Sequence, residues 1–194
     1  MTQTQTHGSQ RDSLLSSSIT VSAYLAMEKS KDRSNISRFI RERFHERYVA
    51  PFDGNHRKNG FIMMASACLM VEAMESFWNG WKKSPKSSDA FKQFFCREER
   101  FLSLHEYAQE FYEHVRCGIL HQGETTGGWH IRRDLGILFD DSTKTIDATV
   151  FLSAMDCSLT DYVQRLSNAS WGCDEWKKFR RKMKSLCANT AIKV

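Results

Sequence analysis

The residues best suited to chemistry are Arg116 and His121, which lie in the stretch FYEHVRCGILHQGETTGGW, residues 111–129. Arginine presents a planar set of donors that fits a phosphate and keeps its charge. Histidine takes or gives a proton near neutral pH. Without a metal ion, the two can assist attack of a ribose 2′-hydroxyl on its phosphate and stabilise the growing charge. This chemistry requires RNA, because DNA lacks the 2′-hydroxyl.

The spacing places a geometric condition on that chemistry. Five positions along an ideal α-helix correspond to a rotation of about 140°, so Arg116 and His121 would not share a face. They can converge if the helix loosens between them, which Gly118 and Gly123 would allow, or if a second subunit contributes. The sequence therefore predicts a loosened helix or a symmetric dimer.

The spacing alone is not specific. With 15 arginines and 7 histidines in the chain, about 1.6 Arg–His pairs separated by four to six residues are expected by chance. Three occur: Arg38 and His45, Arg100 and His105, and Arg116 and His121. Only the third pair lies on the core-facing segment of a long helix that opens into a glycine-rich loop. The alternative is structural: Arg116 pairs with Glu113, Glu124 or another carboxylate, and His121 is a helix C-terminal residue favoured by the dipole.

Helical periodicity dominates the chain. Helices are expected over residues 34–49, 58–81 and 90–95, from Ser103 or His105 to about 121, from Ala148 to Leu166, and over 174–186. The residues expected to form the apolar stripe into the Arg116 segment are Leu104, Ala108, Phe111, Val115 and Gly118. Asp147 is expected to cap the helix from Ala148, whose inward residues are Phe151, Met155, Leu159, Tyr162 and Leu166.

Residues 135–151 read as a small β-hairpin, because apolar residues flank DDSTK on both sides. The fold class predicted is all-α, an up-and-down helical bundle with this minor hairpin after the helix of Arg116. The helix over 58–81 is apolar enough to be central. Its residues Glu72 and Glu75 either orient Arg116 or His121 or form a solvated or interhelical polar stripe, and the stripe is favoured.

The chain divides into a flexible N-terminal lead, residues 1–27, and a single helical domain, residues 28–194. Within the lead, residues 1–13 are expected to be a mobile tail, and residues 14–27 a short strand or a helical lead-in. The domain ends in a basic helix, residues 172–187, whose run KKFRRKMK is expected to be a solvated outer face. Contact with RNA phosphates is the alternative for this helix.

Composition favours a soluble, cytoplasmic protein without a membrane span. The net charge of +5 tolerates a polyanionic partner without requiring one. Six cysteines without a CxxC pair read as free thiols in a reducing compartment. The start of the chain lacks the basic and apolar regions of a signal peptide. No metal or cofactor is expected, since the common nucleotide-binding and catalytic motifs do not occur.

The run EFYEHVRCGILHQGE, residues 110–124, resembles the signature helix of HEPN domains, whose ribonuclease members carry Arg, four to six residues and His. The resemblance covers residues 35 to about 167. It implies a helical bundle that dimerises to form a composite, metal-independent ribonuclease site, often in antiviral or toxin–antitoxin systems. Two positions depart from the family: Cys117 replaces a residue that is often polar in active members, and Gly123 replaces a tyrosine that is modified in some.

Three functions follow from these patterns. The first is a dimeric HEPN-like endoribonuclease in which Arg116 stabilises phosphate and His121 acts as acid and base, with a neutralising or regulatory protein as a further partner. The second is a catalytically silent HEPN-like module that binds RNA or a partner protein. The third is an unrelated helical regulator whose basic last helix contacts nucleic acid.

Overall fold

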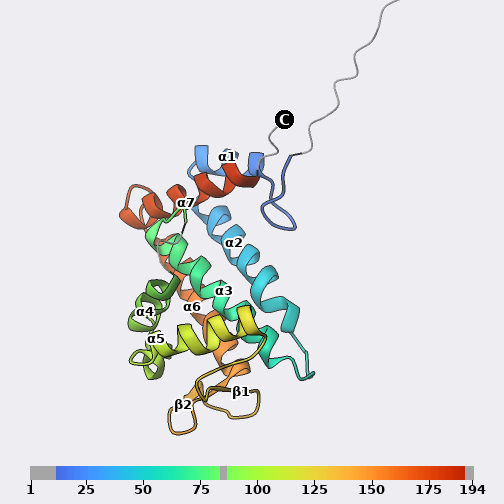
Figure 1. Ribbon diagram of the computed structural model, residues 1–194. Helices are drawn as coiled ribbons and strands as arrows, with labels where there is room; N and C mark the ends of the chain where they lie inside the picture. The colour runs from blue at the N-terminus through green and yellow to red at the C-terminus, as the bar shows by residue number, and fades with distance from the viewer. Residues whose placement is uncertain (1–11, 84–86, 191–194) are drawn as a thin grey trace, which may run out of the picture.

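The chain folds into a mostly helical protein with a small sheet at one end (Figure 1). The computed structural model describes residues 12–83 and 87–190. It is 68% helical and contains a three-stranded mixed sheet. The expectation of a helical fold is confirmed at this level, whereas the up-and-down, HEPN-like form of the bundle stays a prediction.

Along the chain, a series of helices comes first, the three strands follow, and two long helices come last. The helical elements are α1 (Val21–Lys29), α2 (Arg33–Phe44), η1 (His45–Val49), η2 (Ala50–Phe52), α3 (Gly60–Asn79), α4 (Ser87–Arg97), η3 (Glu99–Leu104), α5 (Ala108–Glu110), η4 (Phe111–Arg116), η5 (Gly118–Gln122), α6 (Ala148–Asn168) and α7 (Asp174–Thr190). The strands are β1 (His130–Arg132), β2 (Phe139–Asp140) and β3 (Thr145–Asp147).

Helix α3 forms the centre of the bundle, as its composition predicts. It packs against α6, α4 and α7, and Figure 1 shows it in the middle of the bundle. Its buried side chains include Met64, Met70 and Phe77. By length and composition α3 could cross a membrane, but more than half of the segment is buried inside the protein. Packing in the core accounts for its apolar character.

Residues 12–27 are folded, which corrects the expectation of a flexible lead over residues 1–27. Leu15 and Tyr24 are buried, and the Tyr24 ring lies 6.0 Å from the ring of Phe39 on α2. Burying a leucine and a tyrosine removes apolar surface from water, which contributes to the free energy that holds this segment on the bundle.

The same segment combines the two conformations that its sequence left open. Leu14 pairs with Thr20 in an isolated β-bridge. The Thr20 hydroxyl then accepts a hydrogen bond from the Ala23 amide and begins α1. Residues 1–11, which hold most of the expected mobile tail, lie outside the described residues.

The predicted hairpin is present, and a third strand joins it. Strands β2 and β3 pair antiparallel, and β1 pairs parallel with β3, so the order is β1-β3-β2. The sequence did not indicate β1, because a strand of three residues is too short for a periodic pattern. β1 lies against the start of α3, where a Cβ added to Gly60 would come 3.0 Å from Ile131.

The apolar face of α6 is as predicted, and α7 buries an apolar face of its own. The α6 residues expected to face inward are all buried: Phe151, Met155, Leu159, Tyr162 and Leu166. Trp176, Phe179 and Met183 of α7 are buried as well. These faces pack on α3 and its neighbours, which makes the bundle continuous from α2 to α7.

The basic residues of α7 make structural contacts, not only solvated ones. Arg181 donates to the carbonyl oxygens of Asn79 and Gly80, which lie at the C-terminal end of α3. The last carbonyl groups of a helix lack partners within it, so a cation there is favourable. Arg180 lies over the ring of Trp171, 4.6 Å from its centre. The α7 charges thus help to fix the end of the central helix.

Asp147 joins the sheet to α6 and caps this helix as predicted. One carboxylate oxygen accepts from the amides of Thr149 and Val150, and the other accepts from those of Leu135 and Gly136. The residue is 2% exposed. A buried carboxylate with four donors satisfies amides that would otherwise lose their hydrogen bonds to water.

Replacing Asp147 should therefore destabilise the protein. For Asp147→Ala we expect the free energy of unfolding to fall by about 2–4 kcal/mol, because the helix cap and the loop contacts are lost together. Asp147→Asn should lose less. Asp141→Ala, an exposed position in the same hairpin, should change stability by less than about 0.5 kcal/mol. Chemical denaturation followed by circular dichroism measures all three, and equal midpoints for the two alanine variants would contradict the cap.

Candidate active site

Arg116 and His121 lie on one helical segment that begins at Ala108 and runs through α5, η4 and η5. This start is later than the predicted Ser103 or His105, because the tight 3₁₀ segment η3 and a turn precede it. The predicted apolar stripe is confirmed, since its five residues are buried: Leu104, Ala108, Phe111, Val115 and Gly118. The stripe fixes which side of the segment faces the core.

Most of this segment is wound as a π-helix. In this winding an amide bonds to the carbonyl five residues away along the chain, so residues five positions apart lie closer to one face than they do in an α-helix. The 140° separation of an ideal α-helix therefore does not apply. Arg116 Nη1 lies 3.4 Å from His121 Nε2. The prediction of a loosened helix is confirmed, and the two side chains meet within one chain.

Two glycines allow the chain to turn back directly after His121. Gly123 has a φ of 72°, and its amide donates to the carbonyls of Gly118 and Ile119. A Cβ added to Gly118 would lie 2.5 Å from the carbonyl oxygen of Glu124. The returning loop therefore presses on the helix at a position that only glycine fits.

Glu72 on α3 holds Arg116 in place. Arg116 Nε donates to Glu72 Oε1 over 2.8 Å, and the two side chains are 15% and 18% exposed. Burial disfavours the charged guanidinium, but the bond and charge of Glu72 raise the pKa of Arg116 above its ordinary value. The guanidinium also lies 5.6 Å from the centre of the Tyr112 ring. Because Glu72 takes Nε, Nη1 is left to face His121.

Glu72 thus orients Arg116, which was the less favoured of its two predicted roles. Glu75 does not take part: it is buried and forms an ion pair with Arg97. Burial raises the pKa of the Glu75 carboxyl, and the bond from Arg97 opposes this rise. The two carboxylates, three positions apart on α3, therefore serve two different arginines.

The structural alternative, in which Arg116 pairs with a carboxylate, is confirmed, and the partner is Glu72. The two sequence neighbours named for this role, Glu113 and Glu124, have other partners. Glu113 accepts a hydrogen bond from Gln109, and Glu124 accepts from Thr125. Both carboxylates are exposed, whereas Glu72 approaches Arg116 from the protein interior. Glu72 and Arg116 are 44 residues apart in the sequence, so no local sequence pattern indicates their pairing.

Cys117 and Tyr112 complete the surroundings of Arg116. Burial raises the pKa of Tyr112, and a side-chain hydrogen bond with Cys117 raises it further. The Cys117 thiol is half-buried. An un-ionised phenol at this place leaves Glu72 to balance the charge of Arg116. Sequence patterns did not indicate this cluster, because its members become neighbours only through the winding of the helix.

His121 is exposed to solvent. A guanidinium donates hydrogen bonds and never accepts them, so the contact at Nε2 is a hydrogen bond when the imidazole is neutral and carries its proton on Nδ1. In this form the imidazole is a base beside a permanent cation that is itself fixed by Glu72. This combination can remove a proton from a bound hydroxyl and stabilise negative charge on a neighbouring phosphate.

His114 braces the loop that follows the site. Its Nδ1 lies 2.9 Å from the Thr126 hydroxyl, and its carbonyl accepts from the Thr126 amide. A Cβ added to Gly127 would come 2.6 Å from the His114 ring. The His114 imidazole therefore fixes the loop conformation. Because His114 is two positions from Arg116 in the sequence, it supports the site from the adjoining turn.

The other two Arg–His spacings do not form comparable sites. Arg100 pairs with Asp161, and His105 lies near Glu106. In the remaining pair, Arg38 bonds to Asn35 and lies near Glu42, while His45 lies near Asp53. Each of these side chains is turned toward a different partner. The structure thus distinguishes three patterns that look alike in sequence.

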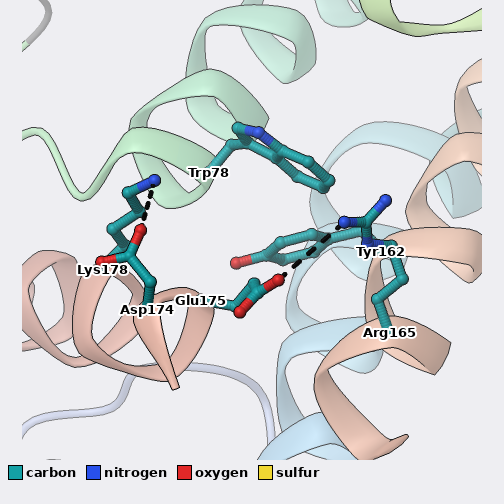
Figure 2. Close-up of a pocket in the computed structure, with 6 residues that line it drawn as sticks. All are labelled: Trp78, Tyr162, Arg165, Asp174, Glu175 and Lys178. Atoms are coloured by element: carbon teal, nitrogen blue, oxygen red, sulfur yellow. Dashed lines mark ion pairs between the residues drawn. The ribbon is translucent and has the colours of Figure 1, made fainter. Parts of the chain in front are cut away.

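A separate pocket of about 230 Å³ lies where α3, α6 and the start of α7 meet (Figure 2). The Arg165 guanidinium lies 4.7 Å from the centre of the Trp78 ring. The Tyr162 hydroxyl is buried and has no hydrogen-bond partner within the described residues. Across the pocket Arg165 lies 3.9 Å from Glu175. Sequence patterns did not indicate this pocket, and it adds no group to the Arg116–His121 site.

In the part of the chain that the structure describes, no three His, Cys, Asp or Glu side chains gather closely enough to hold a metal ion. The chain matches no protein-family model, and no curated protein or solved structure is significantly similar to it. The function must therefore be argued from the geometry of the site.

The ion pair between Glu72 and Arg116 can be tested by a double-mutant cycle. We expect Glu72→Ala and Arg116→Ala each to lower the free energy of unfolding, with a coupling energy of about 1–3 kcal/mol, because each leaves a largely buried charge without its partner. Glu113→Ala combined with Arg116→Ala is the control and should show no coupling. Chemical denaturation measures both cycles, and equal coupling in the two would argue against the pair.

Proposed function

We propose that the chain is a metal-independent endoribonuclease of HEPN type, whose active site contains Arg116 and His121 and is completed by a second copy of the chain. The observation that carries the proposal is the 3.4 Å contact between Arg116 Nη1 and His121 Nε2, which lies in the π-helical part of an amphipathic helix. A cation and a neutral base in contact are the minimum that transphosphorylation of RNA requires.

In the proposed reaction, His121 Nε2 takes the proton of a ribose 2′-hydroxyl as the 2′-oxygen attacks the adjacent phosphorus. The bond to the 5′-oxygen breaks, leaving a 2′,3′-cyclic phosphate and a 5′-hydroxyl that receives a proton from His121 of the partner subunit. Arg116 donates to the non-bridging oxygens, where negative charge grows. Its Nη1 group leaves His121 for the phosphate, which frees the Nε2 lone pair to act as base.

Exposed apolar side chains beside the site support the dimer. Leu69 lies one turn before Glu72 on α3 and is 46% exposed, and Leu120 precedes His121 and is 37% exposed. Ile62, two turns before Leu69, is 65% exposed. Covering these side chains with a second copy would bury apolar surface and bring two sets of catalytic residues together.

The alternative function is the silent HEPN-like module, which the burial and pairing of Arg116 favour. The Arg116 side chain is 15% exposed and is already balanced by Glu72. In this function the same surface binds RNA or a protein without cutting. The third function, a regulator acting through its basic last helix, has lost support because Arg181 and Arg180 of α7 contact the protein itself.

We place the protein in the cytoplasm, in a defence or toxin–antitoxin system with a neutralising or regulatory protein partner. The six cysteines support this location, since all are free thiols, as is usual in reducing compartments. The partner and the pathway are carried over from the HEPN resemblance alone.

Cleavage of RNA in the presence of EDTA tests the catalytic pair. We expect the purified protein to cut single-stranded RNA and Arg116→Ala and His121→Ala each to lose at least about 100-fold in rate, since each removes a group that acts in the transition state. Arg100→Ala and His105→Ala have the same spacing in sequence and should cut normally. Full activity of His121→Ala, or no cleavage by the wild type, would favour the silent module.

The dimer is tested by placing a charge on the exposed apolar surface. Leu69→Asp and Leu120→Asp should weaken self-association by about 100-fold or more, because a carboxylate is costly to bury, and cleavage should fall in parallel. Leu102→Asp, at a 56% exposed leucine on η3, is the control and should remain dimeric. Sedimentation measures the oligomeric state, and a wild-type monomer that cuts RNA would contradict the composite site.

A further inference from the structure

A basic pocket of about 710 Å³ lies between the loop before α3 and strand β1. Arg57 and Lys58 line it from the loop, and Arg132 and Arg133 line it from the strand and the residue after it. Phe61, in the first turn of α3, is half-buried against it. This pocket is larger than the one in Figure 2 and has a different character, since its lining is dominated by positive charge.

The charge of Arg133 is held in place without being neutralised there. Its guanidinium donates to the backbone carbonyls of Asn55 and Arg57, to the Asn59 side chain and to the Thr149 hydroxyl. All four acceptors are uncharged oxygens. A guanidinium fixed in this way keeps its full charge and a defined orientation, which favours binding of an anion.

The other three cations add to this charge. Arg132 forms a two-point bond with Asp134. Arg57 and Lys58 are exposed, and neither has an acidic partner in the described part of the chain. The pocket therefore sets four cations against the single carboxylate of Asp134. Such an excess attracts phosphates more strongly than an overall charge of +5 would suggest.

The start of α3 points its free amides at the same place. Asn59 is the N-cap of α3 but makes no side-chain cap bond, because its side-chain oxygen accepts from Arg133 instead. The first amides of this 20-residue helix thus lack the usual side-chain acceptor. Gly60 itself lines the pocket. The helix N-terminus reinforces the cationic side chains rather than acting alone.

The pocket lies within reach of the proposed active site. Glu72, which holds Arg116, comes twelve positions after Gly60, a distance of about 18 Å along α3. Figure 1 shows β1 and the end of the helix that carries Arg116 near the same end of the bundle, away from α7. At about 3.4 Å per phosphate, the rise along one stacked strand, about five nucleotides cover 18 Å when the bases between the two places stay stacked.

We infer that this pocket binds the phosphates of a single-stranded RNA about five nucleotides from the bond cleaved at Arg116 and His121. The inference rests on the proposed function for the position of the cut, but not for binding. A pocket with a ring on its wall accepts an unstacked base, which duplex RNA does not offer. Arg57 and Lys58 contact the phosphates, the fixed charge of Arg133 attracts them, and the Phe61 ring stacks on a base.

Binding is measured in the His121→Ala variant, so that cleavage does not interfere. The probe is a labelled 12-nucleotide single-stranded RNA, and the readout is fluorescence anisotropy over a range of salt concentrations. Arg57→Glu/Lys58→Glu should weaken binding at least tenfold and reduce the salt slope by about 1.4, since two phosphate contacts are lost. Lys177→Glu/Lys184→Glu, which changes the net charge equally at exposed α7 positions, should leave both nearly unchanged.

Length dependence tests the distance. A 3-nucleotide RNA is too short to occupy both places at once, so it should bind more weakly than the 12-nucleotide RNA. Its cleavage at Arg116 and His121 should be insensitive to Arg57→Glu/Lys58→Glu. Equal losses in the two double variants, no loss in either, or no binding of the 12-nucleotide RNA would overturn the inference. Binding that depends on the pocket, together with an inability of the wild type to cut RNA, would support the pocket and reject the proposed catalysis.

Discussion

The π-helical winding between Phe111 and Gln122 is the constraint on which the site depends. An ideal α-helix over the same residues would point Arg116 and His121 to different sides, and no side-chain rotation would close a separation of about 140°. The wider winding costs hydrogen-bond quality and is therefore rare. Here the cost is met by tertiary contacts: Phe111 and Val115 are buried in the core, and Gly118 accepts the close approach of the returning loop.

The central helix α3 also determines the position of Arg116. α3 is apolar except for a few positions, and its two carboxylates meet arginines from different elements. Glu75 is fully buried against Arg97, so this pair fixes α4 on α3. Glu72 is partly exposed and fixes Arg116. Removing one member of such a pair leaves a charge that water reaches poorly. Arg116 therefore has one strongly preferred position, which a catalytic group needs and a surface arginine lacks.

Sequence patterns predicted the parts of the fold that depend on long apolar periodicity or on a local cap. The buried stripe from Leu104 to Gly118, the apolar face of α6 and the cap at Asp147 all follow from such patterns. The winding around Arg116 does not, because the choice between α and π hydrogen bonds is decided by packing and by the loop after His121. The pairing of Glu72 with Arg116 joins distant parts of the chain, so composition could place Glu72 on a polar stripe but could not select its partner.

Short elements could not be predicted from the sequence, because they also depend on contacts with distant residues. Strand β1 has three residues and is held in place by pairing with β3. It is too short to show an alternation of apolar and polar residues in the sequence. Leu15 and Tyr24 lie in a segment too short to show a clear helical or strand period, yet each fills a position in the core. The basic residues of α7 show the converse: a charged run looked like a solvated face, and Arg181 in fact caps the end of α3.

Glu72 acts on Arg116 in two opposing ways, and their sizes decide whether catalysis is compatible with the ion pair. The carboxylate fixes the guanidinium, but its charge also repels negative charge that grows on a phosphate. At an effective dielectric constant of about 20, Arg116 attracts a charge about 4 Å away by about 4 kcal/mol, and Glu72 repels it from about 7 Å by about 2.4 kcal/mol. The attraction is larger for a phosphate bound at Nη1 on the side away from the carboxylate, because it is then closer to Arg116 than to Glu72. Glu72 thus weakens the attraction between Arg116 and the phosphate without reversing it. It also fixes a long side chain in advance, so that this side chain does not have to be ordered in the transition state.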